Sequence, residues 1–62
     1  MPKYYCEESP GAEVFESNEN TLISAIRRTY ECDEITAKNL LNNSDIDNDI
    51  TLYDGTRVWL EK

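Results

Sequence analysis

The chain has 62 residues, and 13 Asp and Glu against six Lys and Arg give it a formal net charge of −7. A chain this short buries only roughly 60% of the surface that it exposes when unfolded, which leaves no room for a cleft around a large cofactor. It contains no His, so metal sites and proton relays built on imidazole are excluded. No apolar run approaches the ~18 residues of a membrane span. We expect one domain, residues 1–62, with no cofactor and no metal.

The first predicted element is a β-hairpin. Residues 3–8 begin with aromatic side chains, which is typical of a short strand. The next four residues, 9–12, place Pro10 second and Gly11 third, as a type II turn requires. The strand pattern then resumes over residues 13–16, so we expect these segments to pair.

A helical segment follows the hairpin. Ser17 and Asn18 are residue types that accept hydrogen bonds from the free N–H groups of a first helical turn. Apolar residues at spacings of three and four then mark one buried face: Leu22, Ile23, Ile26 and Tyr30. Asp33 can cap a second helix, which ends near residues 42–44 and carries Ile35, Ala37, Leu40 and Leu41. We expect two helices with a bend; one helix over about residues 19–43 is the alternative.

The C-terminal segment predicts a second β-hairpin, with strands around residues 50–52 and 58–60. A two-residue loop would mix apolar residues on both faces of this hairpin. A three-residue loop with Gly55 in the left-handed conformation instead places all the aliphatic side chains on one face. These side chains are Ile50, Leu52, Val58 and Leu60. Arg57 and Trp59 are then left on the opposite face.

The predicted elements alternate in pairs along the chain, in the order ββααββ. The apolar stripe of the helices and the aliphatic face of the C-terminal hairpin must both be buried. Packing the helices on one face of an antiparallel sheet buries both. We therefore expect a small α+β fold, in which two β-hairpins form the sheet and one bent helix or two helices cover one face.

Cys6 and Cys32 are too few for the disulfide framework of a secreted mini-protein. They lack the spacing of a CxxC motif, and no His is present to complete a zinc site. We expect two reduced, mostly buried thiols in a cytoplasmic protein. A bridge between Cys6 and Cys32 stays the alternative.

Two sets of acidic residues are candidates for binding a partner. Asp45, Asp47 and Asp49 alternate, so an extended segment would present them as a row at roughly 6.6 Å intervals, with Ile46 and Ile50 turned inward. Such a row resembles a stretch of nucleic-acid backbone; a calcium loop is disfavoured because the Gly and Glu of an EF-hand are missing. The second set lies on the N-terminal hairpin and has no basic partner close in sequence: Glu7, Glu8, Glu13 and Glu16. For both sets, a solvated surface is the alternative.

Trp59 is the most informative single residue, because Trp is costly to leave in water and is enriched at binding hot spots. Together with Arg57 beside it, and Tyr53 at the turn, it would form a small contact patch. Alternatively, Trp59 folds over the edge of the sheet or packs under the N-terminal hairpin.

The charge balance also limits which classes of partner the chain can bind. The six basic residues are scattered along the chain, so we expect no direct binding to nucleic acid or to an anionic membrane. Catalysis by paired carboxylates needs a cleft that desolvates one of them, and a domain this small offers little room for one. We therefore expect a non-catalytic module that binds a protein with a basic nucleic-acid-binding surface.

In size, acidity and simple α/β build, the chain resembles small phage proteins made against host machinery, namely anti-CRISPR proteins, antirestriction proteins and uracil-DNA glycosylase inhibitors. Glu16-Ser17 after a short strand is similar to an acidic-serine feature of the glycosylase inhibitors. The resemblance implies stoichiometric inhibition of a host defence protein or a DNA- or RNA-processing enzyme, by partial nucleic-acid mimicry in the host cytoplasm.

Two other functions are compatible with the sequence. One is a small structural or regulatory homodimer that uses the C-terminal hairpin as its interface and Trp59 as its anchor. The other is a winged helix-turn-helix regulator. Its second helix would offer only Lys38 as a basic residue, beside Asp33 and Glu34, and would repel DNA.

Overall fold

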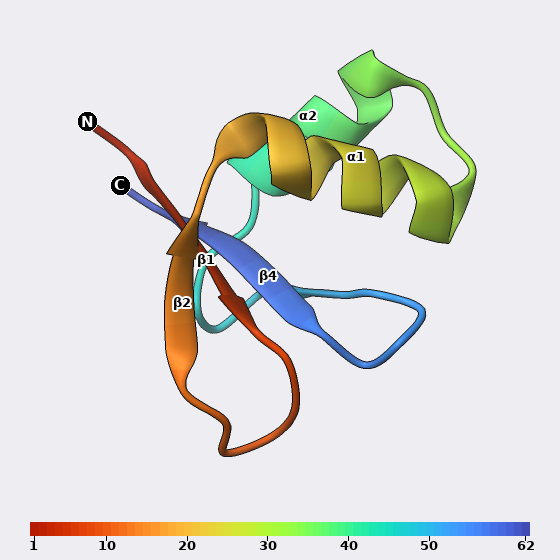
Figure 1. Cartoon of the computed structure of the whole chain (residues 1–62). Coiled ribbons are helices and arrows are strands. Elements are labelled where there is room, and N and C mark those ends of the chain that lie inside the picture. The colour runs from red at the N-terminus through yellow and green to blue at the C-terminus, as the bar shows by residue number, and fades with distance from the viewer.

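Four antiparallel strands and two helices make up the chain in a computed structural model that describes residues 1–62. The elements are β1 (Lys3–Glu7), β2 (Val14–Ser17), α1 (Glu19–Tyr30), α2 (Glu34–Asn42), β3 (Ile50–Thr51) and β4 (Arg57–Glu61). The strands form one sheet in the order β2-β1-β4-β3. Both helices lie on the same side of this sheet (Figure 1). The predicted α+β fold and its order ββααββ are confirmed.

Strands β1 and β2 form the predicted N-terminal hairpin. Ala12 N–H donates a hydrogen bond to Ser9 O at 2.9 Å, which closes a four-residue turn. Gly11, the third residue of this turn, has a φ of 83°. A positive φ at that position is what a type II turn requires, and glycine adopts it without strain.

The C-terminal hairpin has the predicted three-residue loop. Leu52 N–H donates to Thr56 O at 2.7 Å, and Gly55 inside the loop has a φ of 91°. Ile50 pairs with Val58 across β3 and β4, which is the predicted register. All four aliphatic side chains of the hairpin are buried in the core, as expected: Ile50, Leu52, Val58 and Leu60.

The helical segment divides into two helices, as predicted, because each helix has its own N-cap. The Asn18 side chain accepts from Thr21 N–H at 2.9 Å, and the Asp33 side chain accepts from Thr36 N–H at 2.8 Å. The Thr36 N–H also holds the pKa of the Asp33 carboxyl below its usual value. Glu31 ends α1 in the left-handed conformation, with a φ of 51°, and so redirects the chain into α2.

The core lies between the helices and the sheet. Helix α1 buries the first three residues of its predicted stripe, whereas Tyr30 is half exposed. Helix α2 buries Ala37 and Leu41, whereas its other two apolar residues, Ile35 and Leu40, are exposed. Residues four apart lie on the same face of a helix, and this short helix turns only that one line toward the core.

Cys6 and Cys32 are free thiols, and both are partly buried. The alternative of a bridge between them is therefore not realised. Burial raises the pKa of the Cys6 thiol, and the negative charge of Glu8 raises it further. Cys6 packs against the core from β1, where the neutral thiol acts as a small apolar group.

Replacing Ser44 by alanine should destabilise the fold, because Ser44 joins α2 to the sheet. Its hydroxyl donates to Leu41 O at 2.6 Å and accepts from Leu60 N–H at 3.1 Å, and Ser44 is buried. The change would leave a buried N–H without an acceptor, which costs about 1–3 kcal/mol. Urea denaturation would measure the loss, with Ser24→Ala on the exposed side of α1 as the matched control. Equal stability of the two variants would contradict this prediction.

Candidate protein-binding surface

The sheet has an outer face, which is the face turned away from the helices. Residues that pair across strands share a face, and they alternate along each strand. The outer face therefore carries Trp59 together with other side chains of β1, β2 and β4. Among these are Tyr5, Glu7, Val14, Glu16 and Arg57.

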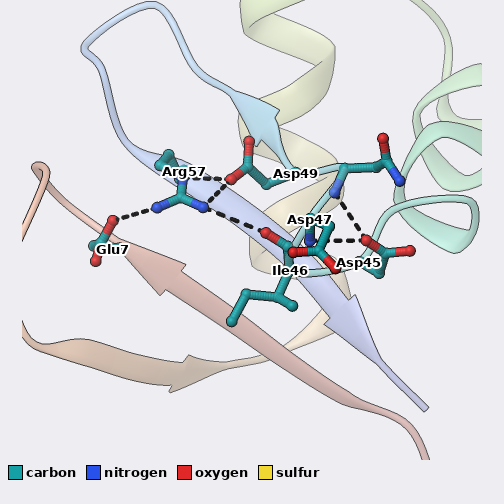
Figure 2. Close-up of polar contacts among 7 residues, drawn as sticks. Glu7, Asp45, Ile46, Asp47, Asp49 and Arg57 are labelled. Atoms are coloured by element: carbon teal, nitrogen blue, oxygen red, sulfur yellow. Dashed lines mark hydrogen bonds and ion pairs between the residues drawn. The ribbon is translucent and has the colours of Figure 1, made fainter.

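Arg57 is the centre of a polar network on the outer face. Its guanidinium donates to Glu7 Oε1 at 2.8 Å and to Ile46 O at 3.4 Å, and it also pairs with Asp49 Oδ2 (Figure 2). Asp49 first, and then Glu7, raise the pKa of this guanidinium above its usual value. Glu7 belongs to β1, whereas Ile46 and Asp49 belong to the loop of residues 43–49 between α2 and β3. Arg57 thus holds this loop against the sheet.

Trp59 lies on the outer face, as predicted, but it is only 2% exposed. Its ring stacks on Tyr5 of the N-terminal hairpin, with ring centroids 6.1 Å apart. Arg57 Cζ lies 5.6 Å from the centroid of the Trp59 ring, within range of a cation–π contact. The open contact patch is therefore wrong, and packing against the N-terminal hairpin is the alternative that the structure shows. The Tyr53 side chain, at the turn, is exposed.

The expected row of three carboxylates does not form, because residues 45–48 turn instead of extending. Asp45 and Asn48 exchange two backbone hydrogen bonds, at 3.1 and 3.3 Å. The Asp45 side chain also accepts from Asp47 N–H and Asn48 N–H, each at 2.8 Å (Figure 2). Asp readily bonds to the backbone two residues ahead, and this local bond outweighs the extended form. Ile46, expected to turn inward, is 56% exposed.

Four of the predicted contact residues keep free carboxylates. They are exposed and have neither an ion pair nor a side-chain hydrogen bond in the structure. We call them the free site carboxylates: Glu8, Glu13, Glu16 and Asp47. Glu7 and Asp49, in contrast, are held by Arg57, and Asp45 stabilises its own turn. The sequence-predicted site is therefore divided between residues that support the fold and residues that remain available to a partner.

The edge of the sheet at β3 is closed by side chains of α1. Tyr30 Oη donates to Thr51 O at 2.9 Å. Tyr53 N–H donates to Thr29 Oγ1 at 3.3 Å. These bonds occupy backbone groups that an edge strand would otherwise present to another chain.

The opposite edge, at β2, is open. Val14 is 44% exposed and Phe15 is 47% exposed. Sequence reasoning missed this edge, although the absence of Lys and Pro from residues 14–17 was a visible signal. Trp59 is only 2% exposed, so it offers no open anchor to a second copy of the chain, and a homodimer through the C-terminal hairpin stays a prediction.

Comparisons with known proteins give no information on function, so the geometry and the charge are the observations that bear on it. No protein-family model, curated protein or solved structure matches this chain. No set of three Cys, Asp or Glu side chains is arranged to hold a metal ion. Neither helix combines the length and the apolar character needed to cross a membrane.

Proposed function

We propose that the chain is a non-catalytic module that binds the basic, nucleic-acid-binding surface of a partner protein and blocks it. The observation that supports this proposal is negative charge that the fold does not neutralise. The net charge is −7, and Glu7 and Asp49 are the only acidic residues in ion pairs. The proposal includes the resemblance to phage-encoded inhibitors of host defence or nucleic-acid enzymes, which rests on the same charge together with size and build, and it takes the host cytoplasm as the place of action.

The free site carboxylates supply the attraction in this proposal. Lys and Arg side chains that normally bind phosphates also bind carboxylates, through charge-assisted hydrogen bonds. Glu8 and Glu13 flank the β1–β2 turn, where no basic residue pairs with them. The attraction acts at long range, accelerates association at low salt and weakens as salt is added.

Reversing Glu8 and Glu13 to Lys should weaken binding to the partner by about tenfold or more at low salt, because the double change turns attraction into repulsion. The matched control is Glu31→Lys with Glu34→Lys, which changes the net charge equally but lies at the junction of α1 and α2. A partner captured from lysate on the immobilised chain would be identified and titrated with each double variant over a range of salt. Duplex DNA or RNA that binds the partner should displace it.

Two results would contradict the proposal. The first is an affinity that both double variants change equally, because the position of the charges would then be irrelevant. The second is a partner that remains bound in the presence of its nucleic acid. Both double variants should fold, because the reversed carboxylates are exposed and exposed charges contribute little to stability.

A further inference from the structure

The register of the sheet determines which backbone groups of β2 point outward. Leu52 N–H donates to Thr56 O and Ile50 pairs with Val58, so even-numbered residues at this end of the chain bond to β3, and by alternation the odd-numbered residues of β4 bond to β1. The odd-numbered residues of β4 pair with the odd-numbered residues of β1. The even-numbered residues of β1 are therefore the ones that bond to β2. Their partners on β2 are Phe15 and Ser17. Val14 and Glu16 therefore direct their N–H and C=O groups away from the sheet.

This open edge combines apolar and acidic side chains. Val14 lies on the outer face and Phe15 on the face of the helices, so one added strand would cover both of these half-exposed side chains. Glu13 and Glu16 place negative charge along the same edge. Edge strands are commonly protected by Lys, Pro or a bulge. Strand β2 has none of these, and no side chain caps it as α1 caps β3.

The charge selects the occupant of this edge. A second copy of the chain would bring Glu16 beside another acidic edge, and two molecules of charge −7 repel each other. A segment with Lys or Arg at alternate positions would instead face Glu16 on the outer face with opposite charge, while its apolar residues cover Phe15 on the other face. The pairing would need no rearrangement of the fold.

We infer that β2 is a docking edge, which adds an extended, basic segment of a partner protein to the sheet as a fifth strand. The inference rests on the proposed function for the sign of the partner's charge. It adds the mode of recognition: main-chain hydrogen bonds from Val14 and Glu16 give affinity, and the neighbouring carboxylates select Lys and Arg.

A short synthetic peptide of alternating Lys and Val is the probe for this inference. Val14→Pro removes one outward N–H without breaking a bond to β1, and it leaves the net charge unchanged. Glu16→Gln is the matched variant, because it removes a charge and keeps the outward N–H. We expect Val14→Pro to weaken peptide binding by about tenfold or more at every salt concentration. Glu16→Gln should weaken it by about two- to threefold, and this effect should fade as salt rises.

Amide hydrogen exchange on the unmodified chain gives a second measurement, which is independent of whether Val14→Pro folds. Exchange at Val14 and Glu16 should slow when the peptide is added, while exchange at Phe15, already bonded to β1, should change little. Peptide bound elsewhere, for example at residues 45–49, would overturn the docking edge and leave the proposed function standing.

Other outcomes separate the two proposals further. Equal binding of a peptide of alternating Glu and Val would contradict a basic partner, and with it both proposals. A dimer seen by sedimentation without peptide, with slow exchange at Glu16, would overturn the foreign segment in favour of a second copy. Unchanged affinity in a folded Val14→Pro variant would also overturn the docking edge.

Discussion

Replacing Trp59 by alanine is expected to unfold a large share of the molecules, not only to remove a contact with a partner. Trp59 is 2% exposed and stacks on Tyr5. Truncation of a buried Trp costs about 3–5 kcal/mol. A chain of 62 residues has a total stability of roughly 3–9 kcal/mol, from ~0.05–0.15 kcal/mol per residue. The loss is therefore comparable with the whole stability, and far-UV circular dichroism with urea denaturation would measure it.

Two further variants separate packing from other effects of this change. Trp59→Phe keeps an aromatic ring against Tyr5 and removes Nε1–H, which has no hydrogen-bond acceptor in the structure. Its loss of stability should be clearly smaller than that of Trp59→Ala. Tyr53→Ala removes an exposed aromatic side chain and should stay within about 0.5 kcal/mol of the parent. A Trp59→Ala variant as stable as Tyr53→Ala would contradict the packing of Trp59.

The same variants bear on how binding data are interpreted. A loss of partner binding by Trp59→Ala would follow from unfolding alone, so it would not identify Trp59 as a contact residue. The free site carboxylates carry no such ambiguity, because they are exposed and unpaired. Changes of charge at Glu8 and Glu13 therefore test the proposed function more directly than any change on β4.

The parts of the fold that the sequence predicts correctly are those determined by neighbouring residues. Gly11 and Gly55 mark positions that need a positive φ. Asn18 and Asp33 mark the starts of the two helices through bonds to N–H groups three residues ahead. The aliphatic face of the C-terminal hairpin selects a single loop length, because a shift by one residue would move its side chains to the other face.

The parts that could not be predicted depend on contacts between distant segments. Glu7 and Arg57 are 50 positions apart, and nothing near either residue indicates that they pair. The sequence places Trp59 on the correct face, but its burial depends on contacts with Tyr5 of the neighbouring strand and with Arg57. The open edge at β2 requires the order of the strands, which the element order alone does not give. The turn at Asp45, in contrast, was within reach of sequence reasoning, because Asp is a frequent turn former.

Replacing Arg57 by methionine is expected to release the loop of residues 43–49 from the outer face while α1 stays folded. Methionine keeps an apolar stem beside Trp59 but donates no hydrogen bond. Glu7 and Asp49, both largely buried, would lose their only ion-pair partner, and a carboxylate in that position is stable only when it is paired. Amide exchange at residues 45–48 should then accelerate by about tenfold or more, with little change in α1.

Arg57→Lys should give an intermediate result, because one ammonium group cannot reproduce the fork with which the guanidinium reaches Glu7, Ile46 and Asp49. Arg28→Met, at an exposed arginine without an ion pair, is the matched control. Trp59 is the only Trp of the chain, so its fluorescence reports directly on the outer face. Release of the loop should shift its emission to longer wavelength and open it to quenching by acrylamide. Slow exchange at residues 45–48 and unchanged emission in Arg57→Met would show that the loop is held by contacts other than those of Arg57.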